Sequence, residues 1–146
     1  MTNIQYTESP GVPPQSMEDE FLCHKNGSEW WYCTGFISDE SGRLFSFQFT
    51  LARVRIYFVQ FHILMTALTD FETKKHYYAQ QPIFFGKNVS ITSGKIGLDN
   101  VAEMQFDGRE VKLHINGPGY SLSLEMNAVK APVWHCDNGV LKMGVD

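Results

Sequence analysis

Basic residues are too few and too scattered in this sequence for binding to nucleic acid or to an anionic membrane surface. Lysine and arginine together number 12, against 16 aspartates and glutamates, which gives a formal net charge of -4. No Lys/Arg cluster is available to neutralise a phosphate backbone. No run approaches the roughly 18 apolar residues of a spanning helix, and the N-terminus lacks the basic start and apolar segment of a secretory signal. We expect no nucleic-acid partner and no membrane span.

Cysteine is also scarce, and its spacing favours free thiols. Cys23, Cys33 and Cys136 form no Cys-x-x-Cys pair, which is typical of a reducing compartment. We therefore expect a cytoplasmic protein, with a bridge between Cys23 and Cys136 as the alternative.

The common catalytic and cofactor-binding motifs are absent. The sequence has no phosphate-binding loop, no His-Glu-x-x-His pair and no Gly-x-Ser-x-Gly elbow, so the enzyme classes that carry them lose their main support. The five histidines are scattered without metal-ligand spacing, although Cys136 and Asp137 beside His135 leave a metal site open as an alternative. We predict no metal and no cofactor.

Aromatic and apolar residues, in contrast, are plentiful. Hydrophobic residues make up 43% of the 146 residues and aromatic residues 14%, which suits one globular domain with a sizeable core. Residues 1–20 include Pro10, Gly11, Pro13 and Pro14 among polar residues, and we predict that they form a flexible arm. Residues 21–146 are predicted to form the domain.

The apolar residues occur in short runs of period two, which predict eight strands separated by turn signals. The strands cover residues 30–37, 43–54, 57–69, 76–85, 95–98, 101–106, 111–115 and 120–127. No segment has a clear helical period, so helix is at most a minor part. Eight strands joined by mostly short turns are typical of an all-β, antiparallel up-and-down meander that closes into a barrel wide enough for one small ligand.

Two adjacent tryptophans beside a carboxylate indicate a pocket lined by aromatic rings. Glu29 directly precedes Trp30, Trp31 and Tyr32, and each buried indole N–H needs a hydrogen-bond partner. We predict an apolar cavity whose substrate-binding side chains come from several strands and from the segment near the C-terminus. These side chains are Trp30, Trp31, Phe47, Gln48, Thr50, Tyr78, Trp134 and His135.

Three residues are candidates for catalysis, and two of them have structural alternatives. His62 lies in the most apolar strand and is either a buried neutral histidine paired to a neighbour or a proton donor or acceptor lining the cavity. Glu29 is a solvated charge at the barrel mouth, a partner for indole and loop N–H groups, or a general acid whose pKa is raised by burial. Tyr32 is the candidate hydrogen-bonding group.

An ordered set of motifs carries a resemblance to a known family. The motifs are Glu29-Trp30-Trp31-Tyr32, Thr34-Gly35 with Asp39 and Gly42, Phe47-Gln48-Phe49-Thr50, His62, Ala67-Leu68-Thr69-Asp70, Tyr77-Tyr78-Ala79, and His135 with Asp137-Asn138-Gly139. Together they resemble the first barrel of the lipocalin-like family related to bacterial carotenoid 1,2-hydratases and attachment-type, AttH-like proteins. The resemblance implies a lipocalin-like barrel that is usually followed by a second one, and some relatives are cofactor-free cyclases, including Diels-Alder catalysts.

Two functional hypotheses follow from the resemblance and the candidate residues. The first is a cofactor-independent hydratase or cyclase for an isoprenoid, polyene or polyketide, with Glu29 or His62 as acid, Tyr32 and Gln48 hydrogen-bonding the substrate, and the aromatic side chains as the mould around it. The alternative is a non-catalytic lipocalin-like binding or structural module for a hydrophobic ligand. Because the sequence ends where the second barrel of the family would begin, a homodimer is a further expectation.

Overall fold

The computed structural model describes residues 2–7, 21–25, 27–131 and 133. Within these residues, twelve strands form three sheets and no residue is helical. The same part of the chain therefore holds no helix long and apolar enough to cross a bilayer. The prediction of an all-β fold is confirmed.

The first large sheet is an antiparallel meander of four strands. They are β4 (Glu29–Ser38), β5 (Leu44–Ile56), β6 (Val59–Asp70) and β7 (Lys75–Phe84), paired in chain order. The β4–β5 turn closes because the Asp39 carboxylate accepts hydrogen bonds from the backbone N–H groups of Ser41 and Arg43, at 2.9 and 3.0 Å. Gly42 completes the turn with a φ of 86°, a left-handed conformation that glycine adopts without strain.

The second large sheet has six strands in the order β1-β8-β9-β10-β11-β12. They are β1 (Asn3–Ile4), β8 (Val89–Thr92), β9 (Lys95–Leu98), β10 (Ala102–Asp107), β11 (Glu110–Gly117) and β12 (Tyr120–Asn127). All neighbours are antiparallel except β1, which pairs with β8 in parallel. A small parallel sheet of β2 (Tyr6–Thr7) and β3 (Cys23–His24) is tied to it through Gln5, whose N–H donates to the Ile91 carbonyl at 2.8 Å.

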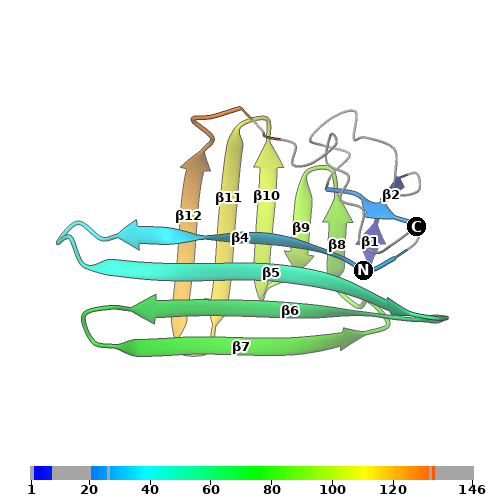
Figure 1. Cartoon of the computed structure of the whole chain (residues 1–146), viewed down its shortest axis with the longest axis horizontal. Coiled ribbons are helices and arrows are strands. Elements are labelled where there is room, and N and C mark those ends of the chain that lie inside the picture. The colour runs from blue at the N-terminus through cyan, green and yellow to red at the C-terminus, as the bar shows by residue number, and fades with distance from the viewer. Residues whose placement is uncertain (1, 8–20, 26, 132, 134–146) are drawn as a thin grey trace, which may run out of the picture.

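The two large sheets pack face to face, and the strands of one run across those of the other (Figure 1). Sheets that are each twisted stack either aligned or crossed, and this molecule uses the crossed arrangement. Side chains from both inner faces form one core, whose fully buried members include Phe49, Leu51, Ile91, Ile96 and Leu113. The space between the sheets is therefore occupied by the protein's own apolar side chains.

The expected closed barrel is wrong. One sheet has β4 and β7 at its edges and the other has β1 and β12, and none of the described strands pairs across the two sheets. A barrel needs a continuous hydrogen-bonded ladder around its circumference. Here the chain changes sheets between β7 and β8, so the meander divides into two stacked layers.

The eight predicted strands are all present, with limits within two residues of those expected. The four strands that the pattern missed are short: β1, β2 and β3 have two residues each, and β8 has Val89, Ser90 and Ile91 all buried, which removes the alternation. Within the predicted arm, residues 3–4 and 6–7 form short strands that pair with β8 and β3, and the flexibility of the arm stays a prediction. Residues 8–20 lie outside the described residues.

Candidate functional site

The four-stranded sheet places the predicted site residues on opposite faces. Successive side chains of a strand point to opposite sides of its sheet. The inward set, facing the six-stranded sheet, is Glu29, Trp31, Phe47 and His62, and the outward set is Trp30, Tyr32, Gln48, Thr50 and Tyr78. The two sets consequently do not line one cavity, and their predicted roles in binding and catalysis stay predictions.

Two of the inward residues belong to the hydrophobic core. Trp31 is 7% exposed and Phe47 is 5% exposed, and both pack in the cluster between the sheets. The Phe47 ring also packs against Gly35: a Cβ added to Gly35 would lie 3.2 Å from the Phe47 ring. These aromatic rings are used for packing, which explains why the strands that carry them are so rich in large apolar residues.

The aromatic residues of the outward set are largely exposed. Trp30 is 65% exposed, Tyr32 63% and Tyr78 50%. Their polar neighbours are satisfied within the face, since Gln48 Nε2 donates to Thr50 Oγ1 at 3.1 Å and the Tyr78 hydroxyl donates to Gln80 Oε1 at 2.7 Å. This arrangement presents aromatic rings to whatever covers the sheet.

A buried polar row crosses the inner face at one end of the sheet. Glu29 on β4, Arg53 on β5 and His62 on β6 stand opposite one another in register. One Arg53 Nη lies 2.7 Å from a Glu29 carboxylate oxygen, and the Arg53 side chain is fully buried. The other carboxylate oxygen lies 2.8 Å from His24 Nδ1. Glu29 is thus held between a guanidinium and an imidazole, as an acceptor of hydrogen bonds.

His62 is the least satisfied member of this row. Its side chain is buried, and neither ring nitrogen has a hydrogen-bond partner among the described residues; in the same part of the chain Arg53 Nε is likewise buried without one. Burial, and then the positive charge of Arg53, lower the pKa of His62 to about 4. His62 is therefore a neutral imidazole at neutral pH, and the described part of the chain does not supply the hydrogen-bond partner that such a buried residue usually has.

Arg53 and His24 were not predicted from the sequence as partners of Glu29, although the position of Arg53 in its strand could have indicated this role. Arg53 shares its position in the alternation with Phe47, Phe49 and Leu51, so it stands on the apolar face of its strand. An arginine in such a place needs a buried carboxylate. His24 left no signal, because it reaches Glu29 from β3.

The nearby thiol is not activated for nucleophilic chemistry. Burial, followed by the negative charge of Glu29, raises the pKa of Cys23 to about 12. The thiolate is the nucleophile and the metal ligand of cysteine, so Cys23 stays a thiol. Among the described residues no group of three His, Cys, Asp or Glu side chains is placed to hold a metal ion, and Cys23 and Cys33 are free.

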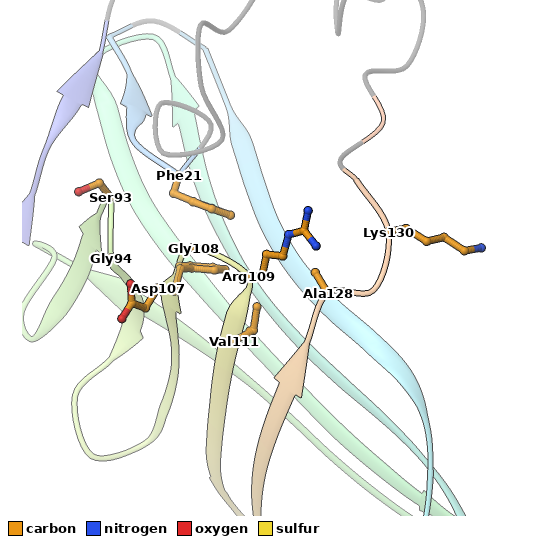
Figure 2. Close-up of a pocket in the computed structure, with 10 residues that line it drawn as sticks. Phe21, Ser93, Gly94, Asp107, Gly108, Arg109, Val111, Ala128 and Lys130 are labelled. Atoms are coloured by element: carbon orange, nitrogen blue, oxygen red, sulfur yellow. The ribbon is translucent and has the colours of Figure 1, made fainter.

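A separate pocket of about 460 Å³ opens at the end of the six-stranded sheet (Figure 2). It is lined by the β8–β9 turn, the β10–β11 turn, the segment after β12, and Phe21 before β3. Its residues are Phe21, Ser93, Gly94, Phe106, Asp107, Gly108, Arg109, Val111, Ala128 and Lys130. Two backbone hydrogen bonds of 2.9 Å fix the walls, from Phe106 N–H to the Gly94 carbonyl and from Ala128 N–H to the Arg109 carbonyl.

The pocket has an apolar floor and charged groups at its rim. The rings of Phe21 and Phe106 stack with centroids 3.7 Å apart, and Val111 and Ala128 continue the apolar surface. In Figure 2 the Arg109 side chain stands between Phe21 and Ala128, while Lys130 extends away from the floor. Among the described residues, no acidic side chain forms an ion pair with the Arg109 guanidinium.

None of the pocket residues was predicted from the sequence. They are spread over three turns and a chain segment, and neither periodicity nor a motif links them. The predicted binding residues Trp134 and His135, and the alternative metal ligands Cys136 and Asp137, lie outside the described residues.

A family model described as AttH-like matches residues 10–146, most of the chain. The chain belongs to the AttH-like family. A search of the curated proteins finds no match. The crystal structure of a protein from Nitrosomonas europaea that carries an AttH designation is similar to this AttH-like chain with a TM-score of 0.76 and 21% sequence identity. The match covers 89% of this chain and 42% of that protein.

The comparisons confirm the resemblance drawn from the sequence motifs. At 21% identity the likeness to the Nitrosomonas protein establishes the fold and nothing about a ligand. The AttH-like chain spans less than half the length of that protein.

Proposed function

We propose that this AttH-like chain is a binding module for a small apolar ligand that ends in an anionic group, held in the pocket of Phe21, Phe106, Val111, Arg109 and Ala128. The observation that carries the proposal is the combination of a stacked phenylalanine floor with an arginine that has no ion pair in the described part of the molecule. Ligand sites are typically concave and mostly apolar, with a few polar groups that orient the ligand.

The volume and the charge of the pocket indicate the ligand class. Pockets for small molecules usually measure about 300–1,000 Å³, and this one measures about 460 Å³. The guanidinium of Arg109 suits a carboxylate, which it can bind with two parallel hydrogen bonds. A medium-chain fatty acid or an isoprenoid acid combines both features.

Hydratase or cyclase chemistry has weaker support. That hypothesis needs an acid, a hydrogen-bonding group and an apolar mould around one substrate. Glu29 and His62 share the inner face of the sheet, whereas Tyr32 lies on the outer face. Catalysis by these three residues stays a prediction, and the binding function is the better supported of the two hypotheses.

Displacement of a fluorescent probe tests the binding function. We expect dodecanoate to displace 1-anilinonaphthalene-8-sulfonate from the chain, and the neutral analogue dodecanol to do so more weakly. Arg109→Gln should weaken dodecanoate binding about tenfold, the loss of one charge-assisted contact, and leave dodecanol binding unchanged. Lys112→Gln removes an exposed cation from β11, which begins directly after Arg109, at a position outside this pocket, and serves as the control.

A filled pocket gives the complementary test. Ala128→Trp places a large ring at the pocket wall, on an exposed position after β12 where the fold tolerates it. We expect dodecanoate binding to be abolished while the unfolding transition is unchanged. Binding that survives Ala128→Trp at wild-type affinity would show that the ligand sits elsewhere and would reject the proposal.

A further inference from the structure

The outer face of the four-stranded sheet, formed by the outward side chains of β4 to β7, is uncharged over its whole extent. Strand pairing puts Trp30, Ala52, Ile63 and Pro82 in one row, and Tyr32, Thr50, Met65 and Gln80 in the next. No Lys, Arg, Asp or Glu occupies any outward position of the four strands, and the one histidine at such a position is His76. The surface of a protein rarely lacks charge over a complete sheet face.

This outer face is large enough for a stable interface. Its five most prominent aromatic residues are exposed to between 50% and 71%: Trp30, Tyr32, Phe36, Tyr78 and Phe84. Five such rings together present on the order of 600 Å² of apolar surface. The largest apolar patch on a typical monomer is about 300–600 Å², and one partner of a standard interface buries about 800 Å². With the smaller apolar residues between the rings included, the face matches one partner's share.

The shape of the outer face is suited to its own copy. The exposed aromatic rings stand on the edge strands β4 and β7. Midway along the sheet, β5 and β6 carry side chains that are little exposed, of which Thr50 is 7% exposed and Ala67 8%, whereas the ends of these strands carry the more exposed Leu44, Ile56 and Val59. A face with ridges at its edges and a trough between them complements itself when a two-fold axis lays a ridge of one copy in the trough of the other.

The charge distribution also favours a second copy. Each chain carries a formal net charge of -4, so two copies repel each other wherever charged surfaces meet. The outer face is the side of this sheet where two copies meet without bringing like charges together. Pro82 on the edge strand β7 has no backbone N–H to extend the ladder, which favours association by the face over association by that edge.

We propose that the outer face of the four-stranded sheet is a homodimer interface, in which the aromatic rings of β4 in one copy pack against β5 and β6 of the other. This interface is independent of the binding function, because the pocket opens at the end of the other large sheet. The test is the mass of the 146-residue chain in solution, measured by sedimentation equilibrium and light scattering at micromolar concentration. We expect twice the chain mass of 16.7 kDa.

Charge placed on the outer face should break the dimer. Tyr32→Lys puts an unpaired cation among the aromatic rings, and we expect the dimer dissociation constant to rise at least a hundredfold. Gln48→Lys, at an exposed polar position of the same face, should raise it about tenfold and keeps the test valid if Tyr32→Lys does not fold. Ser123→Lys adds the same charge to the outer face of the six-stranded sheet and should leave the dimer unchanged.

Each alternative outcome rejects the proposal. A wild-type chain that stays at 16.7 kDa would show that the outer face is not a homodimer interface. A dimer that persists unchanged in Tyr32→Lys and Gln48→Lys, with circular dichroism showing native folding, would place the interface on a different surface.

Discussion

The two large sheets distribute their charges in opposite ways. The six-stranded sheet turns Met104, Leu113 and Ile115 inward and carries its charges outside, where Lys95 pairs with Glu103 at 3.0 Å. The four-stranded sheet encloses its Glu29–Arg53 ion pair and places aromatic rings outside. At the far end of its inner face, hydrogen bonds from Arg43 hold the pKa of the buried Asp70 well below its usual range.

This contrast shows what an apolar outer face means. A sheet that packs one face on a core and exposes the other to water alternates apolar and polar residues, as the six-stranded sheet does. Buried and exposed side chains alternate along the strands of the four-stranded sheet too, but many of the exposed side chains of this sheet are also apolar. The inner face packs on the core, and the outer face has the apolar composition that is typical of a buried surface.

The largest expected effect is the loss of the enclosed ion pair. Glu29→Ala leaves the Arg53 guanidinium, fully buried, without its carboxylate, and we expect the free energy of unfolding to fall by about 3–5 kcal/mol. Urea denaturation measures the change. The matched control is Glu125→Ala, which removes the partner of Lys112 at 3.6 Å on the other sheet and should cost less than about 0.5 kcal/mol. Equal effects at the two sites would break the contrast between the sheets.

The second effect is a pH dependence carried by His62. Its pKa in the folded chain is about 4, against an ordinary value of 6.5, because burial disfavours the imidazolium. As the pH falls, the unfolded chain therefore binds this proton at a higher pH than the folded chain does. The contribution of His62 to the free energy of unfolding is fully present above pH 6.5 and declines between pH 6.5 and about 4. His62→Leu should remove on the order of 2 kcal/mol of this decline.

Urea unfolding at a series of pH values measures the His62 effect. His114→Leu is the control, since His114 is an exposed histidine on the outer face of the six-stranded sheet and should leave the slope unchanged. If His62→Leu keeps the wild-type slope between pH 6.5 and 4, the inner face does not hold this imidazole neutral.

The smallest effect is expected at the surface ion pairs of the six-stranded sheet. Lys95 Nζ lies 3.1 Å from an Asp99 oxygen and 3.0 Å from a Glu103 oxygen, and all three side chains are partly exposed. Lys95→Met should lower the free energy of unfolding by at most about 1 kcal/mol. The loss should shrink further in concentrated sodium chloride, because salt screens exposed pairs. If Lys95→Met instead lowers the free energy of unfolding by much more than this, and salt does not reduce the loss, the ion pairs of Lys95 behave as buried pairs.

The strands were predictable because each long strand repeats its apolar positions with period two. Arg53 was predictable in principle, since a charge on the apolar face of a strand needs a partner, but its partner could not be chosen among the carboxylates of the chain. The pocket was not predictable, because Phe21, Phe106 and Arg109 come together only when turns from separate hairpins meet at one end of a sheet. Strand β8 escaped notice because its residues are buried on both faces.

By itself, the sequence determined the all-β composition, the limits of eight strands to within two residues, the family motifs and the separation of each strand into two faces. Only the tertiary structure decided that the meander divides into two crossed sheets, and that Trp30 and Tyr32 face outward while Trp31 faces the core. The physical reason is that period two identifies two faces without saying which is covered. That choice depends on contacts between residues far apart in the chain, here the packing of the four-stranded sheet on the strands that follow it.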